Sequence, residues 1–139
     1  VKGTSIEATV LYNIAHIKVR QYKYSDALQY HKRALGIRRA LKDRQAEAQS
    51  LNDIGSLYIL LKNNAKAFAN YTLALKIRLS EKDIKGAAES HNNMGTLFMQ
   101  NNDYKHAVIS YQLALQAARE SQAHAEIAKS YDGLYECFK

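Results

Sequence analysis

The chain has 139 residues, of which 47% are hydrophobic, and it carries a formal net charge of +7. Its single cysteine excludes an internal disulfide framework and is compatible with a reducing compartment. No apolar run is long enough to span a membrane, so we expect no membrane insertion and a cytoplasmic location.

Apolar residues recur at helical spacing along nearly the whole chain. In one stretch Leu51, Ile54, Tyr58 and Leu61 fall on one face of a helix, and no stretch alternates long enough to indicate a strand. We therefore predict an all-α fold with seven helices, at about residues 5–21, 24–41, 44–61, 64–81, 84–101, 104–121 and 124–138.

Turn-forming residues separate these helices. Asn63-Asn64 and Asn101-Asn102-Asp103 lie between two helices, and asparagine tolerates left-handed backbone. Asp43 and Asp83 recur 40 residues apart and are suited to cap the helix that follows each of them.

The sequence repeats with a period of 40 residues. Residues 51–58 align with residues 91–98, with Gly55 on Gly95, and residues 11–18 fit the same frame with Ala15 in place of glycine. The second half of the unit repeats as well, most clearly in Ala27, Ala67 and Ala107. A fixed period of this length indicates a stacked array of units.

The repeated positions resemble the tetratricopeptide pattern of Leu-Gly, Tyr, Ala, an aromatic residue and Ala. The second unit carries it as Ile54-Gly55, Tyr58, Ala67, Tyr71 and Ala74, and the first unit is the weakest match. The resemblance implies a right-handed superhelical α-solenoid of antiparallel helix pairs. About 3.5 repeats form one array over residues 1–139, with repeats at about 4–43, 44–83 and 84–123 and a half repeat at 124–139.

Two departures from the usual pattern have one explanation. The usual unit has 34 residues and ends in proline, whereas this unit has 40 and the chain contains no proline. The corresponding positions hold Arg39, Leu79 and Arg119, so we expect the second helix to continue past its usual end. The 40-residue unit is similar to that of Pins/LGN-type adaptors and of tetratricopeptide domains in bacterial signalling proteins.

Small residues stand where the two helices of a unit should approach each other. Ala15, Gly55 and Gly95 occupy equivalent positions, and we expect the alanines of the second helix to face them. Glycine within a helix costs about 1 kcal/mol relative to alanine, so close packing is expected to offset that cost.

The resemblance implies that the first helix of each repeat lines a concave groove in which a partner lies. Helical spacing then selects the residues that share this face. The half repeat contributes Lys129, Asp132 and Glu136 to it. The predicted partner-binding residues are Tyr12, Asn13, His16, Arg20, Asn52, Ser56, Ile59, Asn92, Asn93, Thr96 and Met99. For any one asparagine, groove binding and hydrogen bonding to a neighbouring helix are equally weighted alternatives.

No residue pattern indicates chemistry. Cys137 and His31 align with apolar or aromatic repeat positions, so both are interpreted as packing residues. No two histidines share a helix face at ligand spacing, and no cysteine pair exists, so we expect no metal site. We likewise expect no cofactor and no catalytic residues, and the chain is not expected to be an enzyme.

The basic excess lies mostly in the first 50 residues, which contain 10 basic and 4 acidic side chains. The main cluster is interpreted as a solvated outer face, with an acidic partner or nucleic acid as less favoured alternatives; it comprises Lys32, Arg33, Arg38, Arg39, Lys42 and Arg44.

The predicted function is protein–protein interaction, as a scaffold or sensor that binds a peptide or partner segment in the groove. The partner is another protein or another domain of the same parent, plausibly a signalling or regulatory protein of which this chain is a fragment. Two alternatives remain: the less favoured is nucleic-acid binding through the first repeat, and the other is self-assembly through the last helix, using Tyr131, Leu134, Tyr135 and Phe138.

Overall fold

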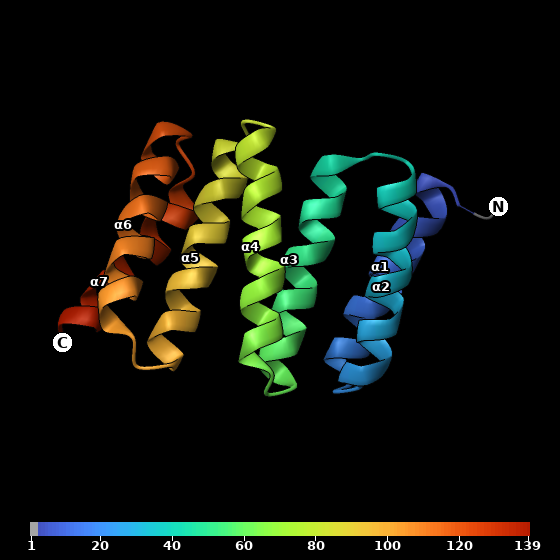
Figure 1. The fold of residues 1–139 in the computed structure, drawn as a ribbon, viewed down its shortest axis with the longest axis horizontal. Coiled ribbons are helices and arrows are strands. Elements are labelled where there is room, and N and C mark those ends of the chain that lie inside the picture. Colours follow the sequence, from blue (N-terminus) through green and yellow to red (C-terminus); the bar gives the residue numbers. More distant parts are fainter. Residues whose placement is uncertain (1–2) are drawn as a thin grey trace. The chain divides into compact units, whose positions relative to one another are not determined.

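The computed structural model describes residues 3–139, which form seven α-helices and no strand (Figure 1). The helices are α1 (Ser5–Arg20), α2 (Tyr24–Ala40), α3 (Arg44–Leu60), α4 (Asn64–Ser80), α5 (Ile84–Gln100), α6 (Tyr104–Glu120) and α7 (His124–Phe138). The all-α prediction is confirmed, and each predicted helix agrees with an observed one to within a residue at either end. No helix in this part of the chain is long and apolar enough to cross a membrane.

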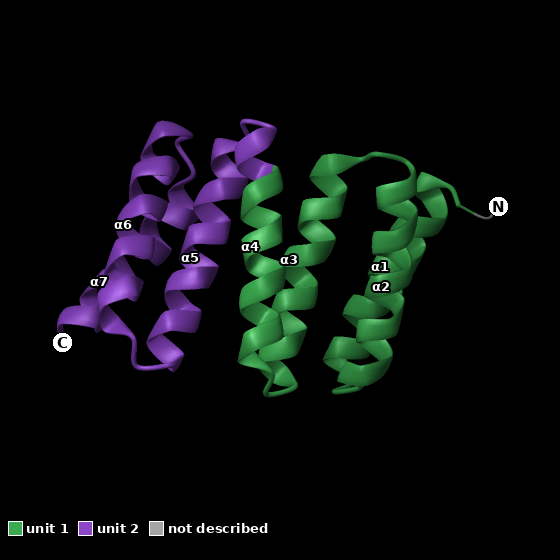
Figure 2. Cartoon of the chain, viewed as in Figure 1, with its two compact units in different colours: residues 1–77 green, residues 78–139 purple. Residues whose placement is uncertain are grey.

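The chain divides into two compact units, residues 1–77 and 78–139, and the boundary falls within α4 (Figure 2). In the first unit α2 packs against both α1 and α3. In the second unit α5 packs against both α6 and α7, and α6 packs against α7. The core of each unit is rich in alanine, with Ala15 and Ala34 fully buried in the first and Ala88 and Ala114 in the second.

Every connection between helices is a three-residue turn of one kind, repeated every 20 residues. The middle residue has left-handed backbone, with φ between 56° and 62°; these residues are Tyr22, Lys42, Lys62, Lys82, Asn102 and Gln122. In the first turn the amide of Tyr22 donates to the carbonyl of Val19, and the amide of Lys23 donates to that of Lys18. This is the Schellman motif, which satisfies the free carbonyls at a helix end.

The last residue of each turn is also the N-cap of the helix that follows. Asp43 and Asp83 accept hydrogen bonds from the amides of Ala46 and Gly86, as predicted. The prediction of left-handed backbone is confirmed at Asn102 but wrong at Asn63-Asn64, because Lys62 takes that conformation and Asn63 instead caps α4.

The second helices continue past the positions where related repeats carry proline. α2 ends at Ala40, α4 at Ser80 and α6 at Glu120, one residue beyond Arg39, Leu79 and Arg119. The predicted extension of the second helix is therefore confirmed.

The two helices of a pair approach closely at the predicted glycines. A Cβ atom added to Gly55 would lie 2.7 Å from the Tyr71 ring, and one added to Gly95 would lie 2.7 Å from the Tyr111 ring. The tyrosine rings supply the nearest atoms, and the carbonyl oxygen of Ala67 lies 3.3 Å from the Cβ position of Gly55, so an alanine of the second helix also faces that glycine. The first pair holds Ala15 and the smaller ring of His31 at the equivalent positions, and both are buried.

We predict that Gly55→Ala lowers the free energy of unfolding by about 1–3 kcal/mol, because the new methyl group overlaps the Tyr71 ring. Gly36→Ala is the matched control, since an added Cβ there meets no atom within 4 Å and should stabilise α2 by about 1 kcal/mol. Combining Gly55→Ala with Tyr71→His gives this helix pair the alanine and histidine of the first pair, and it should recover part of the lost free energy of unfolding. Chemical denaturation measures all three, and equal effects of the two glycine substitutions would contradict the close approach.

Candidate functional site

Three side chains, one each from α1, α2 and α3, form a polar cluster in the first unit. Tyr12 of α1 donates a hydrogen bond from its hydroxyl to Oδ2 of Asp53 on α3. The Arg38 guanidinium of α2 lies 4.5 Å from the centre of the Tyr12 ring, a cation–π contact. Burial raises the pKa of Tyr12 above its ordinary value, and the hydrogen bond to Asp53 raises it further. Tyr12 therefore stays protonated and is held between α1, α2 and α3.

Two histidines pack edge to face against Tyr12 and against each other. The ring centres lie 4.5 Å apart for Tyr12 and His16, and 5.2 Å apart for His16 and His31. His31 is 1% exposed, and burial lowers its pKa to about 4 although the Asp53 carboxylate opposes that shift. His31 is thus a buried, neutral imidazole at physiological pH.

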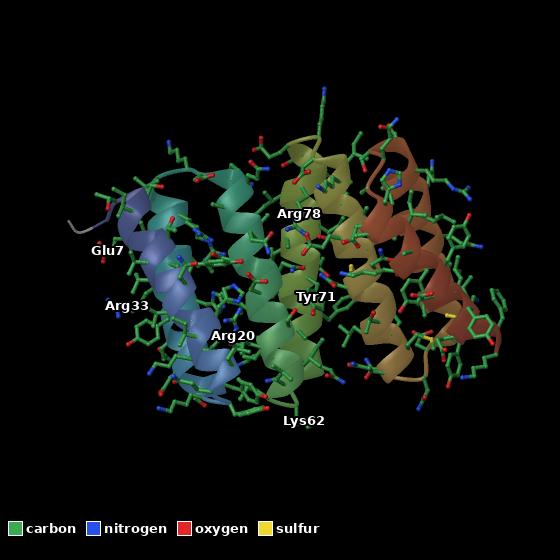
Figure 3. The ribbon with its side chains drawn as sticks, turned by 180° about the vertical axis from the view of Figure 1, so that it is seen from behind. Glu7, Arg20, Arg33, Lys62, Tyr71 and Arg78 are labelled. Atoms are coloured by element: carbon green, nitrogen blue, oxygen red, sulfur yellow. The ribbon has the colours of Figure 1, made fainter. Side chains whose placement is uncertain are left out.

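The equivalent positions of the other pairs hold hydroxyl groups. The Ser56 hydroxyl lies 2.9 Å from the Tyr71 hydroxyl, and the Thr96 hydroxyl lies 3.1 Å from that of Tyr111. Tyr71 lies midway along α4 (Figure 3). Ser56 and Thr96, predicted as groove residues, therefore also connect the two helices of their own pair.

A pocket of about 420 Å³ lies in the second unit between α5, α6 and α7. Its α5 wall contains the four predicted groove residues Asn92, Asn93, Thr96 and Met99, and its α7 wall contains Lys129, Asp132 and Glu136. Tyr111 and Gly133 complete the lining. The residues predicted for the inner face of the last one and a half repeats thus line a single pocket.

Asn92 lines this pocket, but hydrogen bonds hold its amide group. Its Nδ2 donates to the backbone carbonyl of Glu126 at 3.0 Å and to the Glu126 carboxylate at 2.9 Å. Its Oδ1 accepts from the Ser130 hydroxyl at 3.0 Å. Asn92 is 3% exposed. Of the two roles considered for an asparagine, partner binding in the groove or hydrogen bonding to a neighbouring helix, Asn92 therefore has the second.

The remaining predicted groove residues differ in exposure. Asn52 is buried, at 4% exposed, and Ile59 is half-buried. Asn13 and Arg20 are exposed on α1, and Figure 3 labels Arg20 at the end of that helix. On α7 the residues predicted for self-assembly are mostly exposed, with Tyr135 at 67% and Phe138 at 74%.

Cys137 and His91 lie in partly buried positions. The Cys137 sulfur lies 3.3 Å from the Met99 sulfur, and burial raises the pKa of the thiol. Burial also lowers the pKa of His91. A thiol with a raised pKa is a poor nucleophile at neutral pH, which agrees with the interpretation of Cys137 as a packing residue.

The interpretation of the basic cluster as a solvated face was wrong for Arg38, which is buried, whereas the other members of the cluster are exposed. Arg38 is 9% exposed, and its Nη1 donates to the Ser50 hydroxyl at 2.8 Å. Arg39 and Arg44 both pair with the buried carboxylate of Glu47, at 3.1 Å and 2.9 Å. Arg38 and Arg39 thus join α2 to α3, whereas Arg44 pairs with Glu47 within α3.

The second unit repeats this arrangement. Arg78, labelled near the end of α4 in Figure 3, is 3% exposed and donates to the Ser90 hydroxyl at 2.9 Å. It also donates to the carbonyl of Gly86 at 3.1 Å. Arg38 and Arg78, 40 residues apart, are thus both buried and both donate to a serine hydroxyl, a role that the charge count alone did not reveal.

The prediction that no two histidines share a helix face holds for His16 and His31, but it did not consider groups drawn from several helices. One ring nitrogen of His16, one of His31 and a carboxylate oxygen of Asp53 lie within 4.8 Å of one another. Sequence reasoning missed this group because it looked for two histidines on one helix, whereas these three residues come from three helices. The available signal was that positions 16 and 31 both depart from the residues at the equivalent repeat positions.

Comparison with known proteins agrees with the repeat architecture. A tetratricopeptide repeat profile matches residues 6–80, more than half of the chain, and a second one matches residues 88–121. The chain belongs to the tetratricopeptide repeat family. Such repeats generally mediate protein–protein interaction and are typically non-enzymatic scaffolds. Comparison with curated protein sequences found no match.

Among solved structures, this tetratricopeptide chain is similar to the crystal structure of BtubC (BKLC) from P. vanneervenii. The TM-score is 0.74 at 18% sequence identity, over 94% of this chain and 59% of that one. The likeness supports the fold, and the chain spans about three fifths of the length of that structure.

We predict that Asn92→Ala lowers the free energy of unfolding by about 1–3 kcal/mol, because Ser130 and Glu126 lose a buried hydrogen-bond partner. Asn13→Ala, on the exposed face of α1, should change it by less than about 0.5 kcal/mol. Urea denaturation followed by circular dichroism makes the comparison. If both substitutions changed the free energy of unfolding equally little, the hydrogen bonds of Asn92 would not stabilise the fold, and its side chain would be available to a partner.

Proposed function

We propose that this tetratricopeptide array binds a peptide or an extended segment of a partner protein, and that the pocket between α5, α6 and α7 receives part of it. The observation that carries the proposal is the composition of this pocket. Its walls are the inner faces of α5 and α7, which the repeat frame selects as the partner-facing side, and the acidic residues Asp132 and Glu136 of its lining are exposed.

The pocket offers distinct contacts to a ligand. Met99 gives an adaptable apolar surface, and the Thr96 hydroxyl gives a hydrogen-bonding group. Asp132 and Glu136 place two carboxylates on the exposed side of α7. The Glu136 carboxylate also forms an ion pair with Lys139, whose Nζ lies 3.8 Å from Oε1. This arrangement suits a segment with an apolar residue next to a basic or amide side chain.

The proposal treats residues 1–139 as a single array within a cytoplasmic signalling or regulatory protein, and it assigns no catalytic role. The partner is another protein or another domain of the same parent. Nucleic-acid binding is disfavoured, because Arg38 is buried against Ser50 and the exposed Arg39 and Arg44 both pair with the Glu47 carboxylate. Self-association remains a second candidate, favoured by the exposure of Tyr131, Tyr135 and Phe138 on α7.

The test is selection of a random peptide library on the chain, followed by fluorescence anisotropy with synthetic copies of the selected peptides. We expect Asp132→Lys combined with Glu136→Lys to weaken binding at least tenfold, or about 1.4 kcal/mol. Asp26→Lys combined with Glu81→Lys makes the same charge change on exposed residues outside the pocket and should leave binding nearly unchanged.

Equal affinity of the two double variants would place the peptide elsewhere on the surface. Sedimentation velocity on the same samples separates the second candidate: a monomer that binds peptide supports the groove proposal, and a dimer that Tyr135→Lys dissociates supports self-association through α7.

A further inference from the structure

We propose that the first unit binds a divalent transition-metal ion of the zinc class through His16 of α1, His31 of α2 and Asp53 of α3. The three residues offer two imidazole nitrogens and one carboxylate oxygen, a donor set found in zinc sites that keep an open fourth position. Magnesium and calcium are not expected, because both prefer sites made of oxygen ligands.

The geometry brings the donors to one point. The three donor atoms lie within 4.8 Å of one another, and His16 Nε2 lies 3.5 Å from Asp53 Oδ2. Ligands that bind zinc at about 2.0–2.2 Å in a tetrahedral site lie roughly 3.3–3.6 Å apart. Closing the site therefore requires side-chain movements of about an ångström, without any change in the helix packing.

Both imidazoles carry a nitrogen that the protein leaves without a hydrogen bond. Among the described residues, His16 Nε2 and His31 Nδ1 are the buried polar side-chain atoms that make no hydrogen bond, although His16 Nε2 lies near the Asp53 carboxylate. His31 is 1% exposed, so water does not readily supply one. Leaving a buried polar atom unpaired is unfavourable, and a bound cation between the two rings would remove that cost.

The surroundings suit ligation in two further respects. His31 has a pKa of about 4 because of its burial, so its ring is neutral and a lone pair is available at physiological pH. Asp53 is oriented by the Tyr12 hydroxyl and by Gln49 Nε2, which lies 3.4 Å from both carboxylate oxygens. Hydrogen bonds of this kind to a ligating carboxylate fix its orientation in metal sites.

Packing alone does not require this arrangement. The equivalent positions of the next two pairs hold the hydroxyl pairs Ser56–Tyr71 and Thr96–Tyr111, which join their helices through a hydrogen bond. The first pair departs at both positions together, and Asp53 of the following helix completes the group.

One nearby charge opposes the proposal. The Arg38 guanidinium lies 4.5 Å from the centre of the Tyr12 ring and repels a cation. Its hydrogen bonds to Ser50 and to the carbonyl of Ala46 hold it on the α3 side. The same positive charge also lowers the pKa of His31 and so helps to keep that ligand deprotonated.

The test is titration of the chelator-treated chain with zinc chloride by isothermal calorimetry, and with cobalt chloride by visible absorption. We expect one ion per chain, a rise in the melting temperature on adding zinc, and cobalt d–d bands typical of a tetrahedral or five-coordinate site. His16→Ala and Asp53→Asn should each weaken binding at least about tenfold.

His106→Ala is the matched control. His106 Nδ1 lies 2.8 Å from Asp103 Oδ2 on the exposed start of α6, so it is a histidine–carboxylate pair without a third ligand. Retained binding in His106→Ala together with its loss in His16→Ala supports the proposal. It is overturned if the wild-type chain takes up neither metal at about 100 μM, or if His106→Ala weakens binding as much as His16→Ala.

Discussion

The close approach of the two helices within each pair is the constraint on which the other features of this protein depend. At Gly55 there is no room for a methyl group beside the Tyr71 ring, and Gly95 and Tyr111 repeat the arrangement. That contact places each tyrosine hydroxyl beside a hydroxyl on the facing helix. In the first pair Ala15 and the smaller His31 ring take the same positions, and an unpaired imidazole nitrogen results.

A second constraint is the hydrogen bonding of buried polar groups within each unit. Arg38 and Arg78 each cross to a serine on the next helix, and Asn92 joins α5 to α7 through Glu126 and Ser130. Each group is satisfied because it lies between helices, so it is unavailable to a partner. The surface left for binding is therefore smaller than the inner face that helical spacing selects.

The sequence predicted the helices almost completely, because apolar spacing and capping residues such as Asp43 and Asp83 act locally. It also located the close crossings at Gly55 and Gly95. It did not predict the left-handed backbone at Lys62, where the turn imposes a conformation that lysine does not favour. It also missed the burial of Arg38 and the meeting of His16 with Asp53, because both depend on contacts between helices far apart in the sequence.

The residues at the close crossing of each helix pair decide both its packing and its chemistry, and replacing the first pair's residues with those of the second tests this most directly. In the triple variant Ala15→Gly, His16→Ser and His31→Tyr, we expect a folded, helical chain whose melting temperature no longer responds to zinc. A variant that unfolds would show that these positions are not interchangeable between pairs, and one that still binds zinc would place the metal elsewhere. Either result would contradict the account.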